Sequence, residues 1–276
     1  MRDRFGIVSN CWRVQLDEGA SIESLIERGL QLGMRHFELR QGALGDCETE
    51  DRFPISDRLG RLASRFPEAT FDLAVEMPVV TGAAPIDVNF EARCLAAAVA
   101  LASPAYEPRP HLRIVDLAGS AVATGADRAR SLDALSLLDE KLRGASDLSI
   151  LSLEHSIQPW PQFRELFDEA RSAIDLKLCF DPCNLWLFDG GPPVSEIVAS
   201  IEPEQISMLH VKQRGEDSPG VWPGLEPGAL PWPEPIHQLE TAGYVGPILF
   251  ETAPCADVFK QTDANCRQLE EWLRQI

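Results

Sequence analysis

Apolar positions gather in short runs along the chain, and the segments between these runs carry apolar residues at every third or fourth position. The runs are typical of buried strands, and the spaced positions are typical of helices with one face toward a core. Residues 21–32 show the helical pattern, with Ile22, Leu25 and Ile26 on one face and Ser21 as a candidate N-cap. The predicted strands are residues 5–8, 35–39, 71–75, 112–117, 148–154, 176–180, 206–211 and 247–250. The predicted helices are residues 21–32, 55–66, 87–101, 127–142, 160–174, 193–201, 232–242 and 262–276.

Strand and helix alternate strictly, with eight of each. This order is typical of a parallel sheet covered by helices, and eight repeats favour a closed (β/α)8 TIM barrel over an open doubly wound sheet. The first strand continues into GIVSNCW, which lacks the glycine-rich turn of a dinucleotide-binding fold. A length of 276 residues suits a single domain spanning residues 1–276.

Composition excludes several classes of protein. The net charge of −18 argues against a nucleic-acid partner, because phosphate contacts require a positive surface. No apolar run approaches the roughly 18 residues of a membrane span, so we expect no membrane association. The start, MRDRFGIVSN, lacks the apolar core of a signal peptide, and the 7 cysteines form no CxxC pair, so a cytoplasmic location with reduced thiols is expected.

Four consecutive predicted strands end on a side chain that can bind a metal ion. The run from residue 148 ends on Glu154, LKLCF leads to Asp181, ISMLHV contains His210, and GPILF leads to Glu251. Alone, each carboxylate is typical of a helix cap or a surface charge, and the histidine is typical of a satisfied core residue. Barrel strands point their carboxyl ends at one face, however, so the four side chains should converge there.

Three carboxylates and one imidazole suit a single divalent cation, Mn²⁺ or Mg²⁺, with Zn²⁺ and Co²⁺ as alternatives. A ring of buried carboxylates repels itself unless a cation neutralises it. Lys212 follows His210 by two residues and lies on the same side of the strand, so it is a candidate to hold a substrate hydroxyl, carboxylate or phosphate. The alternative for Lys212 is a salt bridge to an acid of the barrel mouth. His155 points away from Glu154 by strand alternation unless the strand has already ended, and it is a second candidate for substrate contact.

The succession LSLEH, FDPCN, LHVKQ, a Gly- and Pro-rich segment and GYVGPILFE resembles the sugar phosphate isomerase/epimerase superfamily of xylose isomerase-like TIM barrels. The resemblance covers most of the chain and is sharpest between residues 148 and 251, where the HVK triplet and the closing GYVGPILFE are its most specific pieces. It implies that Glu154, Asp181, His210 and Glu251 bind one divalent metal. It also implies that Glu154 and Glu251 are the catalytic acid/base groups on opposite faces of the substrate.

The reaction implied is isomerisation or epimerisation of a small sugar or polyhydroxy carbonyl compound through an enediolate, within carbohydrate metabolism. Lewis-acid polarisation of the carbonyl stabilises the enediolate. Return of the proton to the neighbouring carbon gives an isomer, and return to the opposite face gives an epimer.

The sequence departs from the ketose epimerases of that superfamily in the residues that read the sugar. Many of them carry a histidine three residues after the aspartate, where this chain has Asn184, and a further glutamate where it has Trp160. The arginine expected after the histidine strand is out of register, although Arg214 lies close by, and Trp12 offers a ring for stacking on a sugar. The candidate substrate-binding residues are Lys212, His155, Asn184, Arg214 and Trp12.

Other functions remain open at this point. The same barrel supports a metal-dependent dehydratase or lyase acting on a keto-polyol or dehydroshikimate. An endonuclease-like phosphodiesterase would need more metals, more histidines and a basic groove, and a non-catalytic sugar-binding barrel would not need all four ligands. Residues 213–231, rich in Gly and Pro, are interpreted either as a lid or as a passive surface excursion. A homodimer is compatible with such a barrel, and the expected partner is a small-molecule substrate.

Overall fold

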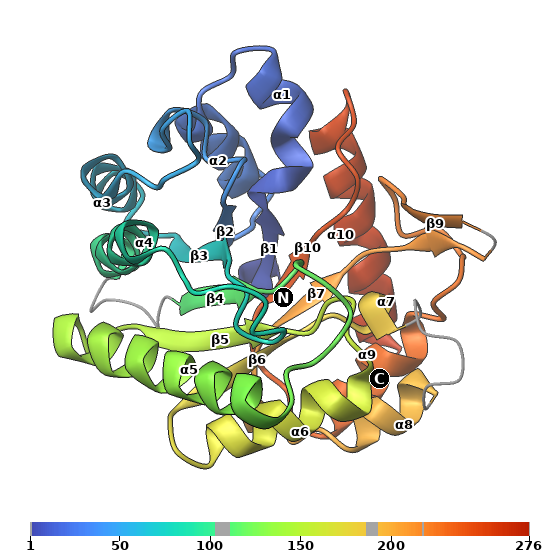
Figure 1. Ribbon diagram of the computed structural model, residues 1–276. Helices are drawn as coiled ribbons and strands as arrows, with labels where there is room; N and C mark the ends of the chain where they lie inside the picture. The colour runs from blue at the N-terminus through green and yellow to red at the C-terminus, as the bar shows by residue number, and fades with distance from the viewer. Residues whose placement is uncertain (1, 103–110, 186–192, 217, 276) are drawn as a thin grey trace.

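Eight parallel strands close into a barrel with helices on its outside (Figure 1). The computed structural model describes residues 2–102, 111–185, 193–216 and 218–275. Neighbouring strands follow one another around the barrel in the order β1-β10-β7-β6-β5-β4-β3-β2, and β2 pairs with β1 to close it. The barrel strands are β1 (Phe5–Val8), β2 (His36–Arg40), β3 (Thr70–Glu76), β4 (His111–Val115), β5 (Ile150–Glu154), β6 (Leu176–Phe180), β7 (Ile206–Val211) and β10 (Ile248–Phe250). The predicted (β/α)8 TIM barrel is confirmed.

The helices cover the barrel where the spacing of apolar residues predicted them. The Ser21 hydroxyl caps the first long helix by accepting a hydrogen bond from the Ser24 amide at 3.2 Å. The main discrepancy is the last helix, which begins at Val258 rather than at residue 262. The long helices are α2 (Ile22–Gln31), α3 (Ser56–Arg65), α4 (Val88–Leu101), α5 (Gly125–Ala145), α6 (Trp160–Arg171), α8 (Val194–Ala199), α9 (Pro233–Thr241) and α10 (Val258–Arg274), with short helices α1 (Arg13–Asp17) and α7 (Pro182–Leu185).

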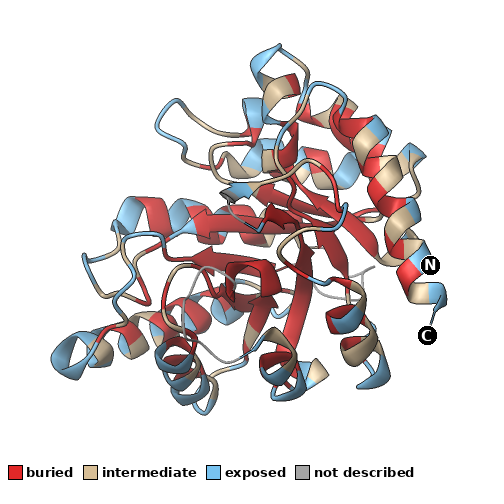
Figure 2. Cartoon of the chain, turned by 90° about the vertical axis from the view of Figure 1, so that its right-hand side faces the viewer, coloured by how far each residue is buried: buried red, intermediate tan, exposed pale blue. Residues whose placement is uncertain are grey.

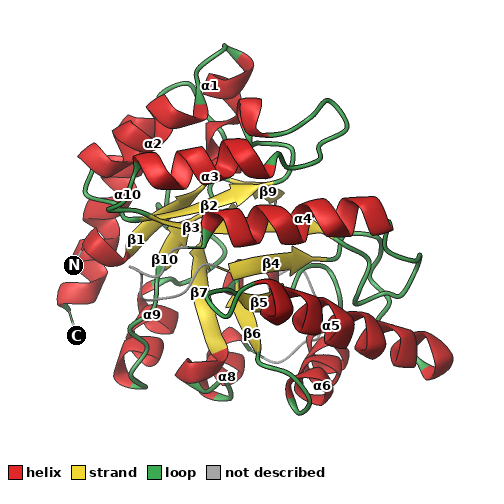
Figure 3. Ribbon diagram, turned by 90° about the vertical axis from the view of Figure 1, so that its left-hand side faces the viewer, coloured by secondary structure: helices red, strands yellow, loops and turns green. Residues whose placement is uncertain are grey.

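Each helix buries only the face that meets the barrel. Figure 2 shows buried residues along the strands and exposed residues on the outward sides of the helices. In Figure 3, α4 and α5 lie across the outside of β3, β4 and β5, where α4 contacts β3 and β4, and α5 contacts β5. The main apolar core therefore lies between the strands and the surrounding helices. Among the described residues, no helix has the length and apolar content needed to cross a membrane.

The interior of the barrel is apolar on one side and charged on the other. A small separate cluster of Val8, Cys179, Met208 and Leu249 fills the part bounded by β1, β6, β7 and β10. Side chains alternate between the two faces of a strand, so His210 projects to the same side as Met208, toward the interior. The interior of β2 and β4, in contrast, holds charged side chains.

Part of the Gly- and Pro-rich segment forms a hairpin. Strands β8 (Arg214–Gly215) and β9 (Ser218–Val221) pair in antiparallel fashion, where the sequence predicted only a loop. The Gln213 side chain anchors the segment: its Nε2 donates to the Leu230 carbonyl at 2.9 Å, and its Oε1 accepts from the Leu230 amide at 3.1 Å. These bonds hold the two ends of the segment together beside the last residues of β7.

Candidate metal centre

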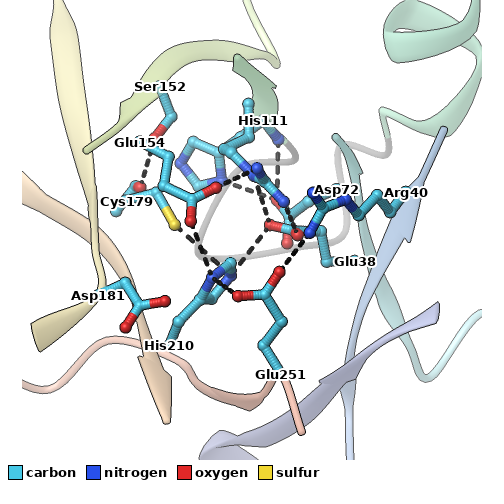
Figure 4. Close-up of polar contacts among 12 residues, drawn as sticks. Glu38, Arg40, Asp72, His111, Ser152, Glu154, Cys179, Asp181, His210 and Glu251 are labelled. Carbon is cyan, nitrogen blue, oxygen red and sulfur yellow. Dashed lines mark hydrogen bonds and ion pairs between the residues drawn. The ribbon is translucent and has the colours of Figure 1, made fainter. Parts of the chain in front are cut away.

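The four predicted ligands meet at the carboxyl ends of their strands. Glu154 ends β5, Asp181 follows β6, His210 lies in β7 and Glu251 follows β10. Each contributes an oxygen or nitrogen atom, and these atoms all lie within 4.8 Å of one another. Figure 4 shows the four side chains pointing toward a common point. None of the four is more than 4% exposed, so the cluster is buried in the barrel mouth.

The donor set fits a divalent cation. His210 Nδ1 lies 3.5 Å from Glu251 Oε2 and 3.9 Å from Glu154 Oε1, which is longer than a good hydrogen bond, so this nitrogen faces the carboxylates without being engaged by them. Three carboxylates and a neutral imidazole are a typical ligand set for a hard or borderline ion. Burial of several carboxylates at one point is unfavourable unless positive charge lies among them. The residues present therefore fit such an ion.

Positive side chains already lie against the carboxylates. Lys212 Nζ is 2.5 Å from Asp181 Oδ2 and 2.7 Å from Glu251 Oε2. Arg40, at the end of β2, forms an ion pair with the other oxygen of Glu251. Burial alone would raise the pKa of Glu251, but Lys212 and the neighbouring cations hold that pKa well below its usual range. Burial raises the pKa of Glu154, and the nearby charge of Glu251 adds to this effect against the opposing Arg113. The two glutamates thus have pKa values that move in opposite directions.

A buried ion pair that the sequence did not predict lies beside the four candidate ligands. Arg113 in β4 forms ion pairs with Glu38 in β2 and with Glu154, and both Arg113 and Glu38 are fully buried. Burial raises the pKa of Glu38, but Arg113 and His210 together outweigh burial and lower that pKa to about 2. The available signal was a charged residue at the central position of each of two strands, HFELR and HLRIV, with an apolar residue on either side of it.

Glu38, Cys179 and His210 form a second close group of ligand-type atoms. Glu38 Oε2 lies 3.3 Å from His210 Nε2, and the Cys179 sulfur lies 3.5 Å from the same nitrogen. Burial raises the pKa of Cys179 to about 12, so its thiol keeps its proton. Because Arg113 already neutralises Glu38, this group is better described as a support of the His210 ring than as a second metal site.

Two of the candidate substrate-binding residues lie within the cluster. Asn184 Nδ2 donates to Glu154 Oε1 at 3.2 Å and to the His155 carbonyl at 2.9 Å, so in this structure the amide holds the Glu154 carboxylate. Lys212 makes the salt bridges to Asp181 and Glu251 that the sequence had left as its alternative role. Arg214 is buried next to Cys183, the second residue after Asp181.

The rings of the two other candidates, His155 and Trp12, point away from the cluster. The His155 ring packs edge-on against Trp160 and Phe163 of α6, and its Nε2 donates to the Gln158 carbonyl at 2.6 Å. Trp12 is fully buried between Phe37 and Phe259, with ring centroids 6.1 Å and 6.3 Å away. Both rings belong to the core between barrel and helices, because strand alternation and the turn after β1 direct them outward.

Comparison with known proteins agrees with the barrel fold described above. Residues 155–276 match the family model described as xylose isomerase-like TIM barrel. No functionally curated protein matches the chain in sequence.

Solved structures cover nearly the whole chain. A structure of L-ribulose 3-epimerase aligns with a TM-score of 0.69 and 16% identity over 99% of this chain and 95% of that one. A xylose isomerase-like TIM barrel protein from Mycobacterium smegmatis in complex with magnesium aligns with a TM-score of 0.64 and 16% identity, covering 92% and 89% of the two chains. An AP endonuclease of family 2 from Brucella melitensis aligns with a TM-score of 0.67 and 13% identity, covering 98% of each chain.

At such identities the solved structures establish the fold alone, and the names of these proteins indicate different activities. Residues 155–276 thus match the xylose isomerase-like TIM barrel model, and nearly the whole chain has the fold of these solved structures.

Proposed function

We propose that this protein is a divalent-metal-dependent isomerase or epimerase that acts on a small sugar or polyhydroxy carbonyl compound through an enediolate. The observation that carries the proposal is the buried cluster of Glu154, Asp181, His210 and Glu251, in which the two glutamates flank His210 Nδ1. The likeness to L-ribulose 3-epimerase and to a magnesium complex supports it. Mn²⁺ or Mg²⁺ is the proposed ion, because three of the four ligands are carboxylates.

Each side chain of the cluster has a distinct task in such a reaction. A bound divalent ion supplies Lewis-acid polarisation of a carbonyl oxygen, which makes the neighbouring C–H more acidic. Glu154 and Glu251 come from different strands and approach the cluster from two sides, so one removes the proton and the same or the other returns it. Lys212 and Arg40 hold the Glu251 carboxylate in place through its two oxygens. Asn184 does the same for Glu154.

The positions of the histidines favour a site for one ion over the multinuclear centre of a phosphodiesterase. Only one of the 5 histidines of the chain, His210, belongs to the cluster of four. The other four bond to groups elsewhere in the fold: His36 to Thr70, His111 to Asp72, His155 to a carbonyl of its own loop and His237 to the Trp272 carbonyl. The charge of −18 also disfavours a nucleic-acid substrate.

The test is metal content and metal-linked stability of the purified protein. We expect about one ion per chain by elemental analysis, and a stabilisation on Mn²⁺ or Mg²⁺ addition of about 2.7 kcal/mol at one hundred times the dissociation constant. Deuterium exchange at the carbon next to the carbonyl, followed by NMR for a panel of ketoses and keto-polyols in D₂O, then identifies the substrate. Absence of both bound metal and a stability shift would overturn the proposal, and two or three zinc ions would favour the phosphodiesterase.

A further inference from the structure

The ion pair of Glu38 and Arg113 contacts two of the four proposed ligands, one through each partner. Glu38 Oε2 lies 3.3 Å from His210 Nε2, and Arg113 Nη1 donates to Glu154 Oε2. Arg113 also binds Glu38 through two nitrogens, with Nε 3.2 Å from Oε2 and Nη2 donating to Oε1. The result is a continuous chain of contacts from His210 through Glu38 and Arg113 to Glu154.

Stability alone does not account for this pair. Both side chains are fully buried in the barrel interior, and removal of two charges from water costs several kcal/mol per ion. Apolar residues of similar volume are often as stabilising or more so, and the other side of the same interior is apolar. The pair therefore calls for a functional explanation.

Its contacts determine which atoms the two ligands present. A carboxylate held by arginine can only accept hydrogen bonds, so His210 presents an N–H at Nε2 to Glu38, and its Nδ1 is directed at Glu154 and Glu251. On the other ligand, Arg113 occupies Oε2 of Glu154 and leaves Oε1 on the side of His210. Outer partners of this kind fix the tautomer and orientation of metal ligands.

We propose that Glu38 and Arg113 are positioning residues of the metal centre, where Glu38 sets the tautomer of His210 and Arg113 sets the donor oxygen of Glu154. The proposal rests on the metal-dependent function proposed above. It adds that two buried residues outside the ligand set determine the affinity for the ion.

The decisive variant is Glu38→Leu/Arg113→Met, which removes one negative and one positive charge together and so leaves the net charge of the interior unchanged. We expect its affinity for Mn²⁺, measured by calorimetry, to fall about 10- to 100-fold, as for other outer partners of metal ligands. Without metal, the free energy of unfolding of this variant, measured in urea, should equal or exceed that of the wild type. The matched control is Asp72→Asn, another buried interior acid, which bonds to His111 rather than to any ligand and should leave the affinity unchanged.

A second readout separates positioning from packing. In ¹H–¹⁵N NMR spectra of the metal-free protein, the wild type should show a hydrogen-bonded Nε2–H proton of His210 that exchanges slowly with water, and the Leu/Met variant should lose this protection. The variant Glu38→Gln/Arg113→Met restores an acceptor oxygen for His210, so the Nε2–H signal should return. Its affinity for Mn²⁺ should stay below that of the wild type, because the contact of Arg113 with Glu154 is still lost.

Wild-type affinity together with unchanged His210 signals in the Leu/Met variant would refute the positioning role while leaving the metal-dependent function intact. If the wild type itself binds no ion, the proposed function fails first. If the Leu/Met variant does not fold, the Gln/Met variant and single Glu38→Gln, measured in the same way, decide the question.

Discussion

The buried His155 should make the stability of this protein fall as the pH is lowered through 6.5. The ring is fully buried against Trp160 and Phe163, and burial lowers its pKa from 6.5 to about 4, although its bond to the Gln158 carbonyl opposes the shift. Below pH 6.5 the unfolded chain takes up a proton that the folded chain does not. His155 in its neutral form therefore gives its full contribution above pH 6.5, and this contribution is lost as the pH falls toward 4.

The magnitude follows from the two pKa values. A difference of one pKa unit corresponds to about 1.4 kcal/mol, so the shift from 6.5 to about 4 corresponds to roughly 3.4 kcal/mol at most. At pH 5 the loss relative to pH 8 is about 2 kcal/mol, because most unfolded chains already carry the proton and few folded chains do.

The assay compares the wild type with His155→Gln by urea unfolding at several pH values from 8 to 5, above the isoelectric point of about 4.6. Gln keeps an N–H donor for the Gln158 carbonyl and does not titrate, so the other ionisable groups cancel in the difference between the two proteins. A chelator is present throughout, so that metal binding does not contribute. The stability advantage of the wild type should shrink by about 2 kcal/mol between pH 8 and pH 5. An advantage that stays constant within about 0.5 kcal/mol would show that burial does not keep this ring neutral.

Three further predictions concern the metal centre. Asp181→Ala should weaken Mn²⁺ binding by more than about tenfold in calorimetry, because loss of a ligand should cost at least as much as loss of an outer partner; an unchanged affinity would exclude Asp181 as a ligand. Lys212→Met should tighten Mn²⁺ binding about tenfold or more, because the Lys212 ammonium competes with the ion for the carboxylates of Asp181 and Glu251. A buried hydrogen bond to a charged group contributes about 1.5–3 kcal/mol, and the ion no longer has to displace such bonds in the variant. Weaker Mn²⁺ binding by the variant would contradict this competition. Glu154→Gln and Glu251→Gln should each lower kcat on an identified substrate by about 10²–10⁴-fold, and full activity in both would refute the two-glutamate mechanism.

The architecture and the convergence of the four candidate ligands could be predicted from the sequence. Apolar runs and helical spacing fix the type of each element, because the two periods are 2 and about 3.6 residues. The order of strands and helices then leaves few alternatives to a parallel barrel. Since all strands of such a barrel end at the same face, four ligand-type residues at four successive strand ends had to converge. Glu154, Asp181, His210 and Glu251 could therefore be predicted without knowledge of any distance.

The surroundings of the ligands depended on tertiary structure. Glu38 and Arg113 lie on β2 and β4, which are separated by β3, and no local pattern says that their side chains meet across the barrel interior. Lys212 could have pointed to substrate or to the acids, and only the packed mouth shows it between Asp181 and Glu251.

The position of the Trp12 ring also depended on tertiary structure. Trp12 follows β1 closely enough to reach the mouth, but the short turn directs its ring onto Phe259 of α10, far away in the sequence. Sequence periodicity specifies which side of an element is apolar, because that depends on neighbours along the chain. Which partner fills the space opposite depends on contacts between distant segments, and these exist only once the barrel has closed.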